Sequence, residues 1–523
     1  MSKKIQIQVS PQVAANEALL KEEIRILEGL SPTAPLYIKI LRRSIDARGR
    51  SIKINLSVQV SQEEIQQEKI ETGYKNVEKA KASCHIIGAG PGGLFAALRC
   101  LELGIKPILI ERGKDVKARR RDLAAIHKEH RVNPESNYCF GEGGAGTYSD
   151  GKLYTRSNKR GDIEKVLKTL VYHGASYEIL VEAHPHIGTN KLPQLIQAIR
   201  ENILHHGGEI HFNTKLIDFQ LQNECIKSVL LLKENMEVEW PVEQVILATG
   251  HSARDIYHLL NSKKVLLEAK PFALGVRAEH PQELIDSIQY HCRSKSEVEH
   301  LREFLPAASY SLVHQVKNHG VYSFCMCPGG IIAPCATHQE EVVTNGWSPS
   351  KRNNPYANSG IVFGLELADF KAYERFGALA GLEFQKELER KAWLLGGKTQ
   401  RAPAQRLSDF VNGKKSSSLP ECSYQPGLNS VEMQEVLGKL IGPALKEGFK
   451  AFGNKMRGYL SNEAVIVGVE SRTSTPVRIP RDKETLRHPQ IKNLYPCGEG
   501  AGYAGGIMSA AMDGERCADK LRQ

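Results

Sequence analysis

The sequence has few cysteines and no long apolar run, and each absence excludes a class of protein. Eleven cysteines in 523 residues are too few for a disulfide scaffold, and they fit a chain kept in a reducing compartment. No apolar run approaches the roughly 18 residues that a membrane-spanning helix needs. The N-terminus, residues 1–5, alternates polar and apolar residues and lacks the apolar core of a signal peptide. We therefore expect a cytoplasmic protein with no membrane partner.

The sequence also lacks a nucleic-acid recognition motif, although its net charge is +11. The charge is spread along the chain, so it indicates a solvated surface and an anionic small ligand more than nucleic acid. Apolar residues make up 41% and charged residues 25%, which is typical of globular proteins. A chain of 523 residues exceeds what one hydrophobic core supports, so two or three domains are expected.

The chain is organised around a glycine-rich loop between an apolar run and a helical pattern. The run 84–87 leads into Gly-x-Gly-x-x-Gly and then into apolar residues at helical spacing. In this motif the first glycine allows a tight turn, the second lets the backbone approach a pyrophosphate, and the third permits close packing of helix on strand. The loop consists of Gly88, Ala89, Gly90, Pro91, Gly92 and Gly93.

A second strand, 106–110, ends at Glu111. An acid about 20 residues beyond the loop can accept hydrogen bonds from an adenosine ribose. Strand, loop, helix, strand and acid together predict a dinucleotide site rather than a structural glycine turn. The basic segment 112–122 is either a solvated helix face or a phosphate-binding element. Arg112 and Arg119 are its best candidates for cofactor contacts.

Residues 133–155 form a second glycine-rich segment. Four glycines lie between 141 and 146, among them Gly143 and Gly144, and such a concentration costs conformational entropy that an ordinary surface loop does not require. We interpret the segment as a platform for a large ring system, and an ordinary surface loop is the alternative. The candidate polar contacts are Thr147, Ser149, Asp150 and Lys152.

Residues 1–80 predict a small module of one strand, one helix and two strands. Alternation at 5–9, 37–45 and 51–60 predicts the strands, and the apolar positions of 16–30 predict an amphipathic helix. We interpret the polar segment 62–81 as a helical connector. No residue of the module points to catalysis.

Residues 265–455 predict a mixed sheet interrupted by helices, which we interpret as a substrate domain. No second Gly-x-Gly-x-x-Gly stands between a strand and a helix here, so a separate NAD(P)H domain is not supported, although nicotinamide binding remains open. Cys325 and Cys327 lie on one predicted strand, with Cys335 close behind. They are candidates for a redox or nucleophilic thiol, and core packing is the alternative. Their spacing lacks the paired Cys-x-x-Cys sets of a zinc site, and we predict no metal.

Two later segments predict further parts of the cofactor domain. The buried strand 244–250 ends in Ala-Thr-Gly250, and residues 494–514 read as a strand, a turn with Gly498 and Glu499, and a small-residue helix that begins near Gly506 and Ile507. The N-terminus of that helix offers N–H groups and a positive dipole end, which stabilise the negative charge of a reduced flavin ring. Glu499 is a candidate partner of the ribityl chain. A structural helix packed through small residues is the alternative.

Together these motifs resemble the glutathione-reductase-type FAD fold. Four further segments, 140–153, 185–192, 324–330 and 470–479, are similar to a family of bacterial FAD-dependent dehydrogenases whose reaction is unassigned. The likeness extends over nearly the whole chain, and Glu499 and Asn190 depart from it because Asp is expected at both positions. The resemblance implies FAD contacts at Gly88, Gly90, Gly93, Glu111, Arg112, Gly250, Glu499 and Ile507, and an adenine contact at the backbone of Leu216.

The predicted fold is therefore α/β. A Rossmann-like FAD-binding domain with a parallel sheet is interrupted by a mixed-sheet substrate domain and preceded by a small N-terminal α+β domain. The expected divisions are 1–80 for the N-terminal module, 81–264 and 456–523 for the FAD-binding domain, and 265–455 for the substrate domain.

Two functions follow as hypotheses. The first is an FAD-dependent oxidoreductase whose flavin carries hydride to or from an unidentified small molecule, with NAD(P)H as a candidate reductant. The alternative is a tRNA-associated flavoprotein of the uridine-modification type, and an assembly protein without turnover is a third reading. The candidate catalytic residues are Cys325, Cys327 and Arg472, and Arg277, Glu470 and Arg478 are further candidates for substrate handling. Each charged candidate can instead form a structural ion pair, and the oligomeric state is not predicted.

Overall fold

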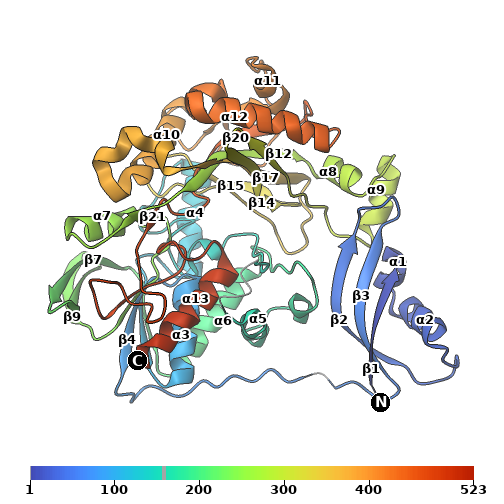
Figure 1. Cartoon of the computed structure of the whole chain (residues 1–523), viewed down its shortest axis with the longest axis horizontal. Helices are drawn as coiled ribbons and strands as arrows, with labels where there is room; N and C mark the ends of the chain where they lie inside the picture. The colour runs from blue at the N-terminus through green and yellow to red at the C-terminus, as the bar shows by residue number, and fades with distance from the viewer. Residues whose placement is uncertain (1, 67, 156–160, 523) are drawn as a thin grey trace.

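The computed structural model describes residues 2–66, 68–155 and 161–522, and Figure 1 shows the chain coloured from its N-terminus to its C-terminus. The first module stands to one side of the molecule, the parallel sheet with its helices forms the lower part, and a larger mixed sheet lies above it. Within the described ranges, no helix is long and apolar enough to cross a bilayer.

The N-terminal module is a three-stranded antiparallel sheet covered by two helices. Its strands, in spatial order, are β1 (Lys3–Val9), β3 (Lys53–Ser61) and β2 (Tyr37–Asp46). The helices are α1 (Pro11–Ala15) and α2 (Glu17–Glu28), and the side chain of Asn16 caps α2 by accepting from the backbone N–H groups of Ala18 and Leu19. Leu20 and Ile24 of α2 are buried against the sheet residues. The strand–helix–strand–strand order is the predicted one.

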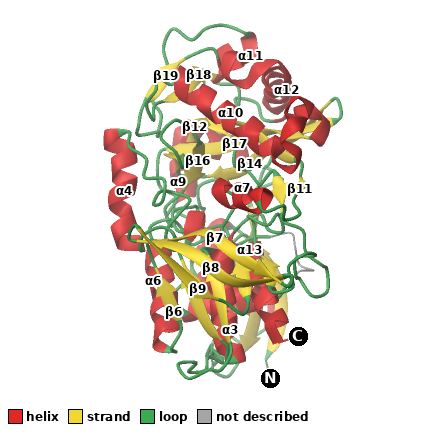
Figure 2. Ribbon diagram, turned by 90° about the vertical axis from the view of Figure 1, so that its left-hand side faces the viewer, coloured by secondary structure: helices red, strands yellow, loops and turns green. Residues whose placement is uncertain are grey.

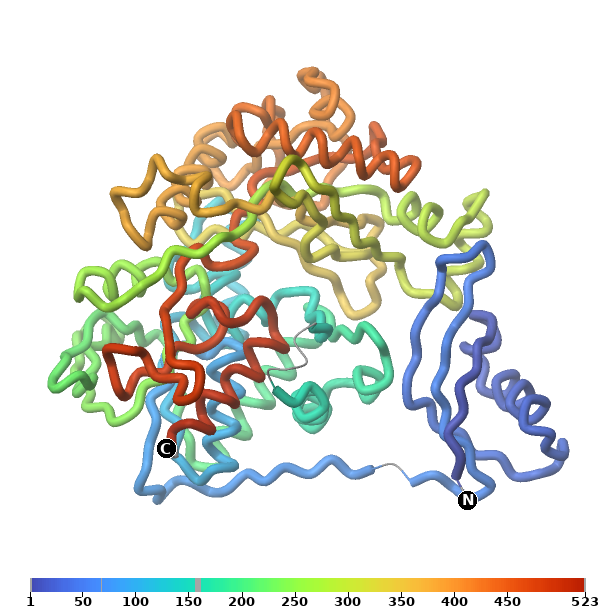
Figure 3. The backbone as a smooth tube through the Cα atoms, viewed as in Figure 1, coloured from blue at the N-terminus to red at the C-terminus, as the bar shows by residue number. Residues whose placement is uncertain are grey.

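The connector between the first module and the parallel sheet contradicts the sequence prediction. The described residues of 62–81 contain no helix, and the segment runs as an open chain along the bottom of Figure 3. The prediction rested on polar composition, but a helix needs an apolar stripe to pack. Val77 is buried and is anchored by a backbone hydrogen bond from its N–H to His206 O (2.8 Å).

The lower part is built on a five-stranded parallel sheet, as predicted. Its strands, in spatial order, are β22 (Leu494–Pro496), β10 (Val245–Leu247), β4 (Ser83–Ile87), β5 (Lys106–Ile110) and β6 (Glu209–His211). The helices α3 (Pro91–Leu103), α6 (Leu192–His205) and α13 (Ile507–Asp519) accompany it. A Cβ on Gly514 of α13 would lie 2.0 Å from the carbonyl oxygen of Gly92 in α3, so small residues let these two helices pack closely.

A three-stranded antiparallel sheet lies over one side of the lower part, facing the viewer in Figure 2. Its strands are β7 (Thr214–Gln222), β8 (Cys225–Lys233) and β9 (Met236–Pro241). The remaining helical elements of the lower part are α4 (Val116–Glu129), η1 (Gly144–Gly146), α5 (Ile163–Tyr172), η2 (Tyr177–Leu180), α7 (Arg254–Ser262) and η4 (Lys520–Arg522).

The upper part is a seven-stranded mixed sheet. Its strands, in spatial order, are β13 (Val313–Val316), β14 (His319–Cys327), β17 (Tyr356–Leu365), β12 (Phe272–Pro281), β20 (Val465–Glu470), β18 (Ala402–Arg406) and β19 (Leu428–Ser430). Two short pairs join β11 (Glu268–Ala269) to β21 (Val477–Arg478) and β15 (Ile331–Pro334) to β16 (Thr344–Trp347). The helices are α8 (Gln282–Gln289), α9 (Lys295–Arg302), η3 (Leu367–Leu379), α10 (Ala380–Leu395), α11 (Leu407–Asn412) and α12 (Met433–Lys455).

The predicted boundary at residue 456 does not follow the sheets. Strand β20 pairs with β12 and β18, so Val465–Glu470 belongs to the mixed sheet and not to the second FAD-binding segment. All six residues of β20 are buried, and a strand that is apolar on both faces carries no pattern that identifies its sheet.

Candidate functional site

A cavity of about 400 Å³ lies where the parallel sheet meets the mixed sheet. The segments that follow β4, β5, β10 and β22 all line it. This position, at the carboxyl ends of parallel strands, is where open α/β sheets bind their ligands, and the volume is within the range of about 300–1,000 Å³ for ligand pockets. Residues 144–146 and 149–152 and two residues of β14, Phe324 and Cys325, also line the cavity.

Most of the predicted cofactor residues line this cavity. They are Gly88, Gly90, Pro91, Gly92, Glu111, Arg112, Gly144, Ser149, Leu216, Gly250, Gly498, Glu499, Gly506 and Ile507. Ala89, Gly93 and Gly143 lie behind the lining. A Cβ on Gly93 would be 1.9 Å from the Gly88 carbonyl oxygen, which is the close helix–strand contact expected of the third glycine. The N–H of Gly143 donates to Ala89 O (2.8 Å).

Two helix N-termini open onto the cavity. Gly90 precedes α3 and Gly506 precedes α13, and no side chain of the described residues caps either helix by a hydrogen bond from these positions. Both termini therefore present free N–H groups and the positive end of a helix dipole to a ligand. The arrangement fits a diphosphate at α3 and a second electron-rich group at α13.

Glu111 links three backbone segments around the cavity. Its Oε2 accepts from the N–H of Ala89 (2.9 Å), and its Oε1 accepts from the N–H groups of Gly113 and Gly141 (2.9 Å each). A carboxylate oxygen offers two lone pairs, so Oε2 can accept a second hydrogen bond. Glu111 thus holds the two glycine-rich loops together in addition to facing the cavity.

The two arginines that follow Glu111 have different positions. Arg112 lines the cavity, pairs with Glu135 (2.6 Å) and Asp255 (2.9 Å), and lies 4.3 Å from the centroid of the Phe140 ring. Arg119 is fully buried and donates only to backbone carbonyl groups among the contacts described. The prediction that Arg119 contacts a cofactor is wrong, because its guanidinium braces the 137–144 loop from inside the protein.

Cys325 and Cys327 differ in their access to the cavity. Cys325 is partly exposed and lines the wall, whereas Cys327 is buried behind it. The Cys327 thiol donates to the carbonyl oxygen of Cys325 (3.3 Å). Lys152 lines the same corner, with its Nζ 4.0 Å from the Cys325 Sγ, and it donates to Met326 O.

The surroundings favour a thiolate at Cys325. The neighbouring Cys327 thiol makes the largest contribution, and together with the charges of Lys152 and Arg277 it lowers the pKa of Cys325 to about 5 against the opposing effect of burial. The same hydrogen bond and burial raise the pKa of Cys327 well above its usual range. Both shifts favour ionisation of Cys325, the sulfur that faces the cavity, over ionisation of Cys327.

Arg277 and Glu470 form a buried ion pair behind this corner. Nε of Arg277 donates to Glu470 Oε2 (2.9 Å), and Nη1 donates to Cys325 O (3.0 Å) and to Asn358 Oδ1 (3.0 Å). Burial raises the pKa of Glu470 to about 7 although Arg277 opposes this. Neither side chain lines the cavity, so their observed contacts match the structural alternative. Arg478 is also outside the lining and pairs weakly with Glu268 (3.7 Å).

Arg472 touches the cavity but is held in a buried network. It donates to Glu341 (2.8 Å), to both carboxylate oxygens of Glu389 (3.1 and 2.8 Å) and to Thr337 (2.9 Å). Arg254 pairs with the same two acids (2.7 Å each). Two arginines and two glutamates balance one another, so the observed contacts place Arg472 in an ion-pair network at the cavity wall, and its catalytic role stays a prediction.

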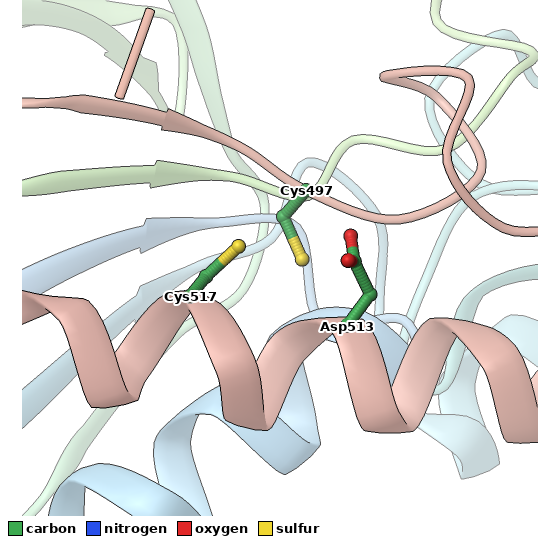
Figure 4. Close-up of side chains that lie close together, drawn as sticks. All are labelled: Cys497, Asp513 and Cys517. Carbon is green, nitrogen blue, oxygen red and sulfur yellow. The ribbon is translucent and has the colours of Figure 1, made fainter. Parts of the chain in front are cut away.

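A group of three possible metal ligands lies beside the cavity. Cys497, Asp513 and Cys517 face one another in Figure 4, with their ligand atoms within 4.8 Å. The Asp513 carboxylate already accepts from Nη1 (2.9 Å) and Nη2 (2.5 Å) of Arg481 and from the N–H of Gly498 (2.8 Å). Since a guanidinium occupies the position that a cation would need, we interpret the group as an ion pair that fixes the turn at Gly498.

Sequence reasoning missed several residues of the wall. His251 and Asn345 line the cavity, and His251 Nδ1 lies 3.7 Å from Glu499 Oε2. His251 directly follows the Ala-Thr-Gly strand end, a position that could have indicated it. Asn345 lies on β16, where no local pattern distinguishes a cavity residue from an edge residue.

Comparison with known proteins identifies parts of the chain. Residues 271–473 match the profile of a family described as "FAD-dependent protein, C-terminal domain-like", and residues 1–61 match a domain of unknown function. An uncharacterised protein of Clostridium beijerinckii is 41% identical over 506 residues, with 92% of each chain covered.

Three solved structures show more distant likenesses. The flavin-dependent brominase Bmp2 is 13% identical, with 83% of this chain and 77% of that chain covered and a TM-score of 0.35. A geranylgeranyl bacteriochlorophyll reductase-like protein of Thermoplasma acidophilum is 12% identical over 84% of this chain and 77% of that chain, with a TM-score of 0.35. CtdE in complex with FAD is 11% identical, with 84% of both chains covered and a TM-score of 0.33. TM-scores this low carry no argument about function.

The matches do not favour the tRNA-associated alternative. Residues 271–473 are similar to the C-terminal domain of FAD-dependent proteins, and the chain as a whole belongs to the same family as the uncharacterised Clostridium beijerinckii protein.

Proposed function

We propose that the protein is an FAD-dependent oxidoreductase that holds FAD in the cavity and acts on a small molecule, with the flavin as hydride carrier and NAD(P)H as a candidate reductant. The observation that carries the proposal is the convergence of two helix N-termini, uncapped by the described side chains, on a cavity at the carboxyl ends of the parallel strands. The family match of residues 271–473 supports the choice of FAD.

Different parts of the wall would hold different parts of FAD. The N–H groups at the start of α3 would hold the diphosphate, and Glu111 would accept from a ribose hydroxyl. The start of α13, with Gly505 to Met508 in the wall, would face the flavin ring and favour its negative charge. When bound, FAD supplies two-electron chemistry that side chains lack.

The remaining wall would receive the substrate. Phe324 and Cys325 of β14, Asn345 of β16 and Lys152 line one corner of the cavity. Lys152 provides a positive charge, and the Asn345 amide provides a donor and an acceptor. This corner therefore suits a small substrate that carries negative charge or polar groups.

The test is the reduction of the purified protein under anaerobic conditions. Protein purified with its cofactor is expected to show the flavin absorption band and to release FAD on denaturation. Titration with NADH and, separately, NADPH should bleach the band if a nicotinamide donates the electrons. Purified protein that neither contains FAD nor takes it up would overturn the proposal. If FAD is bound but neither NADH nor NADPH reduces it, the electron donor is a compound other than a nicotinamide.

A further inference from the structure

We infer that Cys325 and Cys327 form a redox-active dithiol at the cavity wall, with Cys325 as the attacking sulfur and Lys152 as its counter-ion, and that its substrates are disulfides. This inference rests on the proposed function in one respect, because reduced FAD would supply the electrons that restore the dithiol.

The backbone at Cys325 is shaped to present this side chain. Strand β14 loses its regular pairing with β17 between Phe324 and Cys327, and Cys325 has a φ of +46°. A non-glycine residue rarely adopts this left-handed backbone conformation, and such conformations concentrate at functional sites. Arg277 fixes the bend by donating to the Cys325 carbonyl oxygen (3.0 Å).

The two sulfurs have the access that thiol–disulfide exchange requires. Cys325 faces the cavity and can be reached by a substrate, whereas Cys327 is completely buried. The thiol of Cys327 contacts the Cys325 backbone (3.3 Å). A sulfur in this position can attack only a bond already formed on Cys325, which is the role of a resolving thiol.

The charges around the pair favour ionisation of the exposed sulfur alone. Lys152 and Arg277 face it as cations, whereas Asp150 and Glu470 oppose them. Asp150 is neutralised by Arg352 (3.0 Å) and Lys152 (3.7 Å), and Glu470 is paired with Arg277. His186 also lowers the pKa of Asp150. By contrast, burial raises the pKa of the core thiols Cys335 and Cys422.

The chemistry balances in two steps. The Cys325 thiolate attacks one sulfur of a substrate disulfide, forms a mixed disulfide and releases the other half as a thiolate. Cys327 then loses its proton and attacks the Cys325 sulfur, which forms the Cys325–Cys327 disulfide and releases the second half. The substrate gains two electrons, which the two cysteines lose, and its halves leave as two thiolates; the single proton released by Cys327 goes to one of them or to solvent, and solvent supplies any further proton. In the proposed function, reduced FAD supplies the two electrons that restore the dithiol.

The experiment is disulfide mapping on the full-length protein, both as purified and after removal of FAD. The protein is incubated with oxidised glutathione, its free thiols are blocked, and its peptides are identified by mass spectrometry. Wild-type protein should contain the Cys325–Cys327 disulfide. C327S should instead accumulate glutathione on Cys325, and C325S should carry none on Cys327. Cys225, a partly exposed thiol on β8, provides the matched control variant C225S, which should behave as wild type.

Two outcomes overturn the inference. One is that both thiols of the wild-type protein stay reduced. This outcome is measured on wild-type protein, so it does not depend on the folding of a variant. The other is glutathione on Cys325 in C327S at no higher yield than on Cys225. The mapping is repeated without FAD, so a missing disulfide refutes the dithiol and leaves the proposed function untouched. Absence of FAD binding refutes the proposed function instead.

The role of Lys152 has its own readout. The rate at which iodoacetamide alkylates Cys325 is measured against pH in wild-type protein and in K152M, which keeps the alkyl stem. Removing one charge about 4 Å from a thiolate should move the midpoint up by about one pH unit. An unchanged midpoint would assign Lys152 to packing only.

Discussion

The guanidinium of Arg119 is hydrogen-bonded to the carbonyl oxygen of Gly144 at 2.9 Å, from within the protein. Gly144 lines the other side of the same loop, at the cavity. A buried side chain thus sets the position of the backbone that the ligand meets.

Replacing Arg119 by Met should therefore destabilise the protein and weaken its binding of FAD. The substitution removes the Arg119 donor from four carbonyl groups. Those of Glu142 and Gly144 keep a donor in Thr147, whereas those of Asn137 and Tyr138 lose the donor described for them, and each buried, unpaired carbonyl costs about 1–3 kcal/mol. Thermal unfolding of FAD-free protein measures the loss of stability, and equilibrium dialysis measures the affinity for FAD. The exposed Arg121 of the same helix gives the control R121M, and an equal loss in the control would refute the bracing role.

The glycine loop and the network around Arg472 show where sequence reasoning succeeds and fails. Gly88 and Glu111 could be predicted because their partners lie within one β–α–β unit, and local spacing fixes the geometry. Arg472 could not, because it pairs with Glu341 and Glu389, which are separated from it by 131 and 83 residues. The prediction of a cofactor contact at Arg119 failed for a related reason. Arg119, Arg120 and Arg121 are adjacent, and only the rotational position on the helix decides which of them is buried.

Replacing Gly90 by Ala should reduce FAD binding without affecting stability. A Cβ at Gly90 has no neighbour within 4 Å among the described residues, and its φ of −76° is accessible to alanine. If a diphosphate lies against this backbone, the methyl group occupies its space, and the affinity should fall at least about ten-fold. Fluorescence titration of FAD-free protein measures the affinity. G49A, where a Cβ is equally free, is the control, and G90A with unchanged affinity would place the diphosphate elsewhere.

The Glu389 carboxylate should stabilise the fold in a pH-dependent manner. Burial would raise its pKa, but Arg254 and Arg472 lower it from 4.5 to about 2. A carboxyl group with a depressed pKa contributes stability above its unfolded-state pKa, and this contribution is lost as the pH falls through the folded-state value. The shift corresponds to about 3 kcal/mol, lost between about pH 4.5 and 2.

E389Q tests this dependence. At pH 7 the variant should be less stable than wild type by about 3–5 kcal/mol, because two buried arginines lose a partner. The difference should shrink as the pH is lowered toward 2. Urea unfolding at pH 7 and pH 3 measures both values, and E387Q, on the exposed face of the same helix, serves as the control. A difference that does not change with pH would show that Glu389 is not ionised in the folded protein.

The contact between Arg481 and Asp513 predicts that the group of Cys497, Asp513 and Cys517 is held by an ion pair and not by a metal ion. If the pair holds the turn at Gly498, D513N should lose about 3–5 kcal/mol of stability, because the Arg481 guanidinium remains buried without a counter-charge. A chelator should leave the melting temperature of wild-type protein unchanged, because no metal contributes. D519N is the control, since Asp519 lies on the same helix and its pair with Arg99 is partly exposed. A melting temperature that falls on chelation and recovers with zinc would instead show that Cys497, Asp513 and Cys517 bind a metal and that Arg481 moves to admit it.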